Sequence, residues 1–285
     1  MKSSRLILFL LLFLPFFSKA QTVCTPESRQ KLEQSLERIS SLDITNKTSS
    51  ELAAEIGQWF IGTPYVAKTL ELPGEEKLVI DLMGVDCTTY LESVIALVQL
   101  AQKGETSMEA FERELEFIRY RDGSNQGFPS RLHYFSDWMY ANGEKGFFRD
   151  ITAEIGGVAY PNQPTFMSEN PKFYLQLADP KNLTAIKATE ATIATRSYFF
   201  IPKQNISNLE KSIQTGDIIA ITTSLDNLDM VHVGFAFEKN GRIHLLHASS
   251  KNKEVEISTL PLSEYLAGNK SQSGIMVSRL QSPSD

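Results

Sequence analysis

The chain has 285 residues, of which 42% are hydrophobic and 22% are charged. This is the composition of an ordinary globular protein with enough apolar residues for a sizeable core, and the length fits one large domain or a domain with a small appendage. The formal net charge of −6 disfavours nucleic acid as a partner, because a phosphate-binding surface needs clustered Lys and Arg side chains.

The first 20 residues have the pattern of an export signal. Lys2 and Arg5 give a positive start, residues 6–17 are almost continuously apolar, and Ser18-Lys19-Ala20 offers small residues where a signal peptidase cleaves. An uncleaved N-terminal anchor is the alternative, although the apolar stretch is short for a transmembrane helix, which needs about 20 residues. No second apolar segment is long enough to span a bilayer, so we expect residues 21–285 to form a single exported domain without an integral membrane segment.

The first part of this domain has a helical pattern. Residues 26–60 indicate two helices, the second opened by Ser49-Ser50-Glu51, and Gly62-Thr63-Pro64-Tyr65 interrupts the pattern as a turn. Residues 87–102 are apolar nearly all round, which predicts a buried helix, and residues 107–119 predict an amphipathic one.

The last third of the chain changes to strand patterns. Four segments have the pattern of strands: 217–222, 231–238, 242–249 and 275–280. The intervening segment, about 120–205, is rich in aromatic residues, Gly and Pro and shows few periodic stretches, so we expect it to be a long insertion. Helices followed by an antiparallel sheet predict an α+β fold.

Two cysteines follow the export signal, Cys24 and Cys87. In an exported protein such a pair suggests a disulfide. A lipid anchor on Cys24 is disfavoured, because Gln21-Thr22-Val23 lacks the Leu and small residues that precede lipid-modified cysteines. The surroundings of Cys87 argue against the disulfide too, and the role of Cys24 stays open.

Cys87 follows Asp86, a favoured N-cap residue, which places the thiol in the first turn of the expected buried helix. Unpaired N–H groups and the positive end of the helix dipole stabilise a thiolate there, and the same N–H groups can bind an oxyanion. The alternative is a buried structural cysteine. We favour a nucleophile.

A cysteine nucleophile needs a base, usually histidine, and three of the four histidines lie in one expected hairpin. Asn240-Gly241 predicts a two-residue type I′ turn, so that Lys239 pairs with Arg242. In this register His232 lies opposite Ser249 and diagonal to His247 on one face, whereas His244 pairs with Phe237 and points to the other face.

This register selects a Cys–His–His arrangement: Cys87 attacks, His232 takes its proton and His247 orients His232. Structural roles for the histidines are the alternative. A metal site is disfavoured, because there is no H-E-x-x-H motif and His244 and His247 diverge on a strand. A thiol–disulfide oxidoreductase would carry a C-x-x-C pair, which is absent from the sequence.

Five motifs in order resemble those of the NlpC-type cell-wall cysteine hydrolases. They are Gly62-Thr63-Pro64-Tyr65, Asp86-Cys87-Thr88, Gly216-Asp217-Ile218-Ile219, His232-Val233-Gly234 and His247-Ala248-Ser249. From residue 45 onward the chain is similar to the N-acetylmuramoyl-L-alanine amidase-like branch, through Gly62–Glu71, Arg131–Trp138 and Met167-Ser168. The resemblance implies a papain-like α+β domain that acts on peptidoglycan in the periplasm or envelope of a bacterium.

The resemblance also implies residue roles and needs no cofactor. Cys87 would be the nucleophile, His232 the base and His247 the third polar residue. Tyr65 would position the substrate or the oxyanion beside the cysteine. Common members carry Ser or Gly after Asp-Cys-Ser, whereas Thr88-Thr89 follow the cysteine here, as in the amidase-like branch. The long insertion between the cysteine helix and the sheet means that the bond cut by common members cannot simply be transferred to this chain.

The insertion contains a polar and aromatic cluster: Arg131, His133, Tyr134, Asp137 and Trp138. One interpretation is a wall of the substrate cleft, with Arg131 for a peptide carboxylate and an aromatic ring for stacking on a sugar. The other is a packed, hydrogen-bonded loop in which Trp138 belongs to the core. Glu92, one turn into the buried helix, is expected to be a structural charge with an internal partner.

These expectations lead to hydrolysis of the amide that joins the lactyl group of N-acetylmuramic acid to L-alanine, with release of the stem peptide. Cleavage between D-glutamate and the diamino acid of that peptide is one alternative, and a catalytically idle wall-binding module is another. The sequence does not decide between an intact sacculus and muropeptide fragments as substrate, between a free and a tethered protein, or between oligomeric states.

Overall fold

A computed structural model describes residues 22–282, and the export signal expected at residues 1–20 lies outside the described residues. The described chain begins with strand β1 (Thr22–Cys24) and two helices, α1 (Pro26–Ser40) and α2 (Ser49–Gln58). Thr48 caps α2 and exchanges hydrogen bonds with Glu51, which forms a capping box. The two N-terminal helices predicted from the sequence are therefore confirmed.

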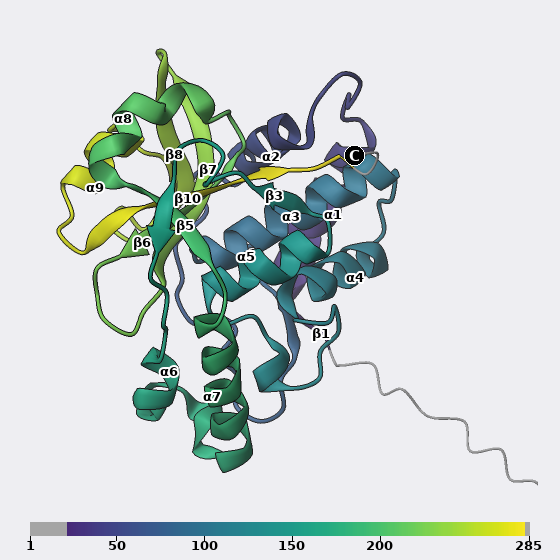
Figure 1. The fold of residues 1–285 in the computed structure, drawn as a ribbon. Helices are drawn as coiled ribbons and strands as arrows, with labels where there is room; N and C mark the ends of the chain where they lie inside the picture. Colours follow the sequence, from purple (N-terminus) through teal and green to yellow (C-terminus); the bar gives the residue numbers. More distant parts are fainter. Residues whose placement is uncertain (1–21, 283–285) are drawn as a thin grey trace, which may run out of the picture.

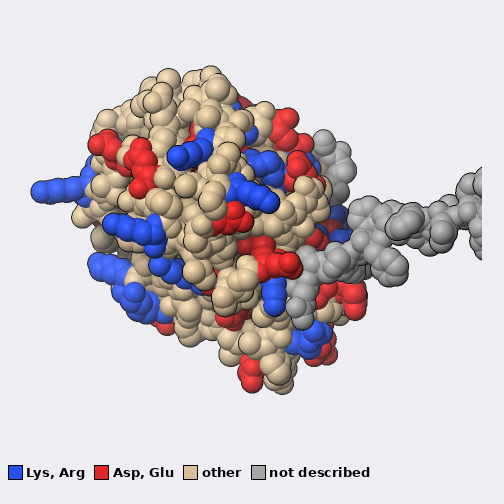
Figure 2. Space-filling view, turned by 90° about the horizontal axis from the view of Figure 1, so that it is seen from below, with Lys and Arg blue, Asp and Glu red and all other residues tan. Residues whose placement is uncertain are grey.

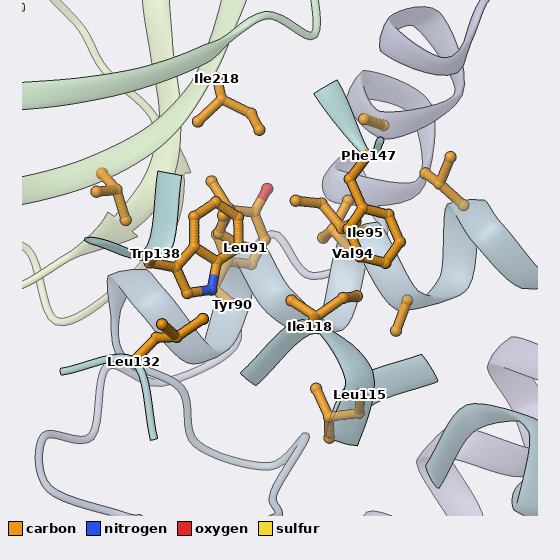
Figure 3. Packing of buried hydrophobic residues seen from close by; sticks show 14 of the residues in the cluster. Tyr90, Leu91, Val94, Ile95, Leu115, Ile118, Leu132, Trp138, Phe147 and Ile218 are labelled. Atoms are coloured by element: carbon orange, nitrogen blue, oxygen red, sulfur yellow. The ribbon is translucent and has the colours of Figure 1, made fainter. Parts of the chain in front are cut away.

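Helix α3 (Cys87–Lys103) runs through the centre of the molecule and is followed by α4 (Met108–Arg119). Asp86 is the N-cap of α3 and Gly104 ends it with a φ of 67°, so both boundaries follow from local sequence signals. Figure 3 shows Tyr90, Leu91, Val94 and Ile95 of α3 packed among side chains of other elements, including Ile118. The predicted buried helix is confirmed.

The main sheet has eight strands in the order β4-β5-β10-β6-β7-β8-β9, with β3 also paired to β10, and all of these pairings are antiparallel. A separate parallel pair joins β1 to β2 (Leu78–Ile80). The strands of the main sheet are β3 (Phe148–Asp150), β4 (Val158–Tyr160), β5 (Tyr198–Pro202), β6 (Ile218–Thr223), β7 (Met230–Lys239), β8 (Arg242–Ser249), β9 (Glu254–Ile257) and β10 (Gln272–Leu280). The α+β class is thus confirmed.

Alternation along β6 explains why both faces of the sheet are covered. Ile218 and Ala220 join the large core that contains α3, whereas Ile219 and Ile221 join a second cluster on the opposite face. Figure 1 shows α3, α4 and α5 (Phe135–Glu144) on one side of the sheet, and α8 (Ile206–Leu209) and α9 (Leu262–Ala267) on the other. The site described below lies at the start of α3 and the start of β7.

The β7–β8 hairpin has the predicted register. Lys239 pairs with Arg242 and Phe237 with His244, and both turn residues have positive φ, 54° for Asn240 and 75° for Gly241, as a type I′ turn requires. The ladder between the two strands ends at the pair of Phe235 and Leu246, so it does not extend to His232.

The segment 120–205 is more regular than its sequence suggests. Besides α5 it contains α6 (Phe166–Glu169) and α7 (Pro180–Ala194), while β3 and β5 add to β10 and β4 extends β5. Residues 120–205 therefore supply the strands at one edge of the main sheet, and they also contribute side chains to the site. Short 3₁₀ helices occur at Phe128–Ser130, Pro171–Phe173, Leu175–Ala178, Lys203–Asn205 and Glu210–Ser212.

Charged side chains are mixed on the surface of the molecule. On the face that Figure 2 shows, Lys and Arg are interspersed with Asp and Glu instead of forming a basic band. Within residues 22–282, no helix combines the length and the apolar character that crossing a membrane requires.

Candidate active site

Cys87 occupies the first position of α3, and the capping box around it is well formed. Asp86 Oδ1 accepts a hydrogen bond of 2.8 Å from the N–H of Thr89, and Thr89 Oγ1 accepts one of 2.9 Å from the N–H of Asp86. Both cysteines are free thiols, so the disulfide between Cys24 and Cys87 does not form.

The sulfur of Cys87 lies against the opened end of the hairpin. It accepts a hydrogen bond from the backbone N–H of Val233, the residue after His232, beyond the last pair of the β7–β8 ladder. The N–H of Val233 lies outside the β7–β8 ladder and is bonded to the sulfur, which places Cys87 against the residue that follows His232. The sequence did not predict this contact.

Burial dominates the acidity of the thiol. Desolvation, followed by the negative charge of Asp86, raises the pKa of Cys87 to about 12, while the hydrogen bonds from Val233 and Thr88 act in the opposite direction. Burial of the sulfur therefore opposes the stabilisation of a thiolate that the start of the helix provides. The raised pKa predicts a neutral thiol in the resting protein.

His232 and His247 form the second part of the site. The Nε2 atom of His232 lies 2.6 Å from Nδ1 of His247, and the rings are nearly perpendicular at 85°. Burial lowers the pKa of His232 to about 3, with a further contribution from His247, and burial lowers the pKa of His247 to about 4. Both imidazoles are neutral at pH 7, so one ring donates and the other accepts.

The position of the proton on His232 determines which of its two nitrogens can act as a base. When the proton is on Nε2, Nε2–H donates to Nδ1 of His247, which leaves Nδ1 of His232 as the free base. The second nitrogen of His247, Nε2, consequently carries a proton and has no hydrogen-bond partner in the described structure.

Glu256 of β9 lies beside that proton, with its Oε1 atom 3.7 Å from Nε2 of His247. The amide of Asn252 holds the carboxylate with bonds of 2.8 and 2.9 Å to its two oxygens. Sequence reasoning missed Glu256, because its position follows from the pairing of β9 with His247 on β8. The signal would have been the alternation of Glu254 and Glu256 across Val255.

Tyr65 lies close to Cys87 but outside the set of side chains that line the adjoining cavity. Its backbone bridges to Val85, two residues before the cysteine. Burial raises the pKa of Tyr65 to about 12, with smaller contributions from the charges of Cys87 and Asp86. Tyr65 is therefore a neutral hydroxyl near the sulfur at physiological pH.

A first cavity of about 310 Å³ opens beside Cys87. Its wall combines the start of α3 with the start of β7 and parts of the insertion, among them Arg131, His133, Tyr134 and Met167. Three of the five cluster residues predicted in the insertion thus reach the cavity.

The polar groups of this first cavity are engaged within the protein. Arg131 lies 2.8 Å from Glu71 and 3.1 Å from Glu76, and Nε2 of His133 lies 2.8 Å from the carbonyl of Phe128. Tyr134 donates to Glu190 at 2.7 Å and accepts from the N–H of Met167 at 2.9 Å. Its charges are therefore largely neutralised before any ligand enters.

Asp137 and Trp138 take the packed arrangement that was the alternative expectation. Both are fully buried; Asp137 pairs with Arg121 at 2.6 Å and Arg196 at 2.7 Å. Trp138 donates to Glu92 at 3.2 Å, and Glu92 also accepts a 2.8 Å bond from Arg119. Glu92 has the internal partners expected of it, although it also lines the first cavity.

His244 stays apart from the site, since its Nδ1 lies 2.7 Å from the carbonyl of Ser258. Among residues 22–282, no group of three or more His, Cys, Asp and Glu side chains is arranged to hold a metal ion. Near Cys87 the structure places two imidazoles that are bonded to each other, and these are residue types that nucleophilic catalysis uses.

Comparison with known proteins shows the family of this chain. Residues 55–275 match a family model described as AmiA-like, N-acetylmuramoyl-L-alanine amidase-like. An N-acetylmuramoyl-L-alanine amidase from Bacteroides uniformis ATCC 8492 is 37% identical, with a TM-score of 0.78 over 82% of this chain and 99% of that chain. No curated protein matches the chain.

Two further solved structures are similar. A putative xylanase from Bacteroides fragilis is 38% identical, with a TM-score of 0.75 over 79% of this chain and 99% of that one. A protein from Legionella pneumophila, 22% identical over 90% of this chain and 96% of that one, shares the fold with a TM-score of 0.66. Because the family model spans most of the chain, this protein belongs to the N-acetylmuramoyl-L-alanine amidase-like family.

Proposed function

We propose that this protein is a cysteine-dependent N-acetylmuramoyl-L-alanine amidase that releases the stem peptide from peptidoglycan or its fragments. The observation that carries the proposal is the placement of Cys87 and His232 on one cavity, with His247 at 2.6 Å behind the base. The family and the Bacteroides uniformis amidase supply the substrate class. Cys87 is the nucleophile, His232 the base and His247 the residue that orients it.

In the first half-reaction Cys87 attacks the lactyl carbonyl carbon while its proton passes to Nδ1 of His232. The oxyanion receives hydrogen bonds from the N–H groups of Cys87 and Thr88 at the start of α3, since the N–H of Thr89 is already bonded to Asp86. Tyr65 is a neutral donor close enough to help. The carbon–nitrogen bond then breaks, and His232 gives its proton to the leaving amine of L-alanine.

In the second half-reaction His232 takes a proton from water, and the hydroxide attacks the thioester carbon. Collapse of that intermediate releases the muramic acid carboxyl group, and the sulfur recovers its proton from His232. Throughout, Nε2–H of His232 remains bonded to His247, so the relay fixes the ring and disperses the transient positive charge.

A glycoside hydrolase is the alternative that the Bacteroides fragilis relative raises. Such an enzyme needs two available carboxyl groups across the scissile bond. In the first cavity Asp86 caps α3, Glu92 accepts from Arg119 and Trp138, and Asp229 accepts from the N–H groups of Ser136 and Met230. These engagements favour the amidase.

The location and domain plan are part of the same proposal. Residues 1–20 act as the export signal, and residues 21–285 form a papain-like domain that works outside the cytoplasm, where peptidoglycan lies. Cleavage between D-glutamate and the diamino acid is the alternative reaction of the same site, and an idle wall-binding module is the non-catalytic one.

Mass spectrometry of defined muropeptides incubated with residues 21–285 tests the proposal, alongside Cys87→Ala as the matched control. We expect an intact peptide that begins with L-alanine, and none from the variant. A product that begins with the diamino acid would move the scissile bond while keeping the mechanism. No cleavage of any muropeptide by the wild type would refute the amidase.

A further inference from the structure

A second cavity, of about 360 Å³, lies on the other side of His232 from Cys87. It is formed by the β8–β9 turn, the start of β10 and α9, and α9 covers the face of the sheet opposite α3 (Figure 1). Val231 and His232 line both cavities, whereas Cys87 lines only the first. Val231 and His232 therefore lie at the boundary between the two cavities.

This geometry divides a bound amide substrate into two halves. The acyl half becomes attached to Cys87 and must remain on the side of the sulfur. The amine half takes its proton from His232, so its chain can continue past the imidazole into the second cavity. Tyr265 connects the two sides: its ring packs edge-on against His247 at 5.5 Å, and it lies near enough to Cys87 to sense its charge.

The polar groups of the second cavity are less engaged than those of the first. Gln272 is 6% exposed, and its Oε1 atom has no hydrogen-bond partner in the described structure. A buried acceptor without a partner costs stability, which a ligand N–H would recover. Lys251 makes no ion pair with any residue of 22–282, whereas the carboxylate of Glu264 lies 3.4 Å from Arg242.

We infer that the second cavity binds the leaving peptide, with Lys251 pairing a peptide carboxylate and Gln272 Oε1 accepting a peptide N–H. The inference rests on the proposed amidase function and adds the side of the cleft that each half of the substrate occupies. Stem peptides carry several carboxylates, whereas the saccharide offers mainly neutral hydroxyl and acetamido groups. The unpaired cation thus favours the peptide here, and the internally neutralised first cavity receives the sugar.

The test compares Lys251→Ala with Lys270→Ala, an exposed lysine of the α9–β10 loop that does not line the cavity. Each enzyme is assayed on two muramoyl peptides, one with free peptide carboxylates and one with those groups amidated. For the free-carboxylate substrate we expect Lys251→Ala to raise KM about fivefold, with kcat changed less than about twofold. The amidated substrate and Lys270→Ala should show neither change, and Lys251→Arg should restore KM.

Binding to Cys87→Ala by calorimetry separates this inference from the proposed function. The free stem peptide should bind, and Gln272→Leu added to that background should weaken it about fivefold, since one buried hydrogen bond is lost. Activity that is indifferent to Lys251 and Gln272 would overturn the inference and leave the amidase standing. Weakening of N-acetylmuramic acid binding instead of peptide binding would reverse the two sides, and absence of cleavage with Lys251-dependent peptide binding would refute only the amidase.

Discussion

The protonation state of Cys87 determines how the proposed reaction would start. With the pKa raised to about 12, about one thiol in 10⁴ is ionised at pH 8, against about one in ten at the usual value of 9.0. A thiolate–imidazolium pair would require His232 to bind a proton more tightly than the sulfur, yet its pKa is lowered to about 3. The structure therefore predicts a neutral thiol beside a neutral imidazole.

Alkylation by iodoacetamide measures this state, because only the thiolate reacts at an appreciable rate. The experiment uses Cys24→Ser, so that Cys87 is the single thiol, and follows the intact mass between pH 6 and pH 11. At pH 8 we expect a rate about a thousandfold below that of a free cysteine, in line with the thiolate fractions. The double variant Cys24→Ser/Cys87→Ala, which has no thiol, reports the background.

The shape of the pH profile separates chemistry from access. If burial controls the thiol, the logarithm of the rate rises by about one per pH unit through the whole alkaline range. If the cavity merely hinders the reagent, the rate is low at every pH but follows a pKa near 9. A fast rate that stays flat from pH 5 to pH 9 would show a preformed ion pair and refute the argument from desolvation.

Further predictions concern the relay and the buried charges. His232→Ala should lower kcat about 10³-fold, and His247→Gln, whose amide oxygen can still accept a hydrogen bond, should lower kcat less than His247→Ala does, as peptide release will show. Glu256→Gln removes the negative charge 3.7 Å from His247 and should reduce kcat severalfold at unchanged KM; an unchanged kcat would exclude a role in the relay. Arg119→Met leaves the carboxylate of Glu92 without its ion-pair partner, which lies 2.8 Å away, and both side chains are only 3% exposed. The free energy of unfolding in urea should therefore fall by about 3–5 kcal/mol, and a fall below about 1 kcal/mol would contradict this prediction. Because the pKa values of His232 and His247 are lowered to about 3 and 4, the unfolded chain binds protons that the fold excludes, so stability should fall by about 1.4 kcal/mol per histidine and pH unit as the pH drops from 6 to 4; urea midpoints that stay constant there would contradict buried neutral rings.

The parts of the site that rest on short-range signals were predictable from the sequence. Asp86 before an apolar run predicts where α3 begins, and Asn240-Gly241 predicts the register that brings His232 and His247 together. Both predictions depend on only a few consecutive residues. Local backbone preference decides them, and tertiary packing does not override it.

The insertion was harder to predict because its regular elements are short or weakly patterned. Strands β3 and β4 have three residues each, too few for alternation to show, and they gain their partners from β10 and β5, which are distant in sequence. Helix α7 buries only Ile186, Glu190 and Ile193, so it lacks the continuous apolar stripe that marks a helix. Its Asp179-Pro180 start was the one usable signal.

The acidity of Cys87 shows a different limit. A helix start lowers a thiol pKa by its dipole, and the sequence displays that half of the balance. The opposing effect is the burial of the sulfur, which raises the pKa of the thiol. The extent of this burial depends on how β7, α3 and the insertion pack together. Glu256 illustrates the same point, since a carboxylate becomes part of the relay only when β9 pairs beside His247.

A β-bulge in β7 lies at the boundary between the two cavities. The pairing of β6 with β7 shifts between Ile221 and Thr222, whose partners are His232 and Met230, so Val231 is the extra, bulged residue. A bulge bends its strand and re-aims the neighbouring side chains, and bulges are frequent beside active sites. Val231 and His232 are the residues that line both cavities, so the bulge is also the wall between sulfur and leaving group. In the proposed mechanism Nδ1 of His232 takes the proton of the thiol and then gives it to the leaving amine, because Nε2 stays bonded to His247. We therefore propose that the bulge aims this one nitrogen at a space that both the sulfur and the amine can reach.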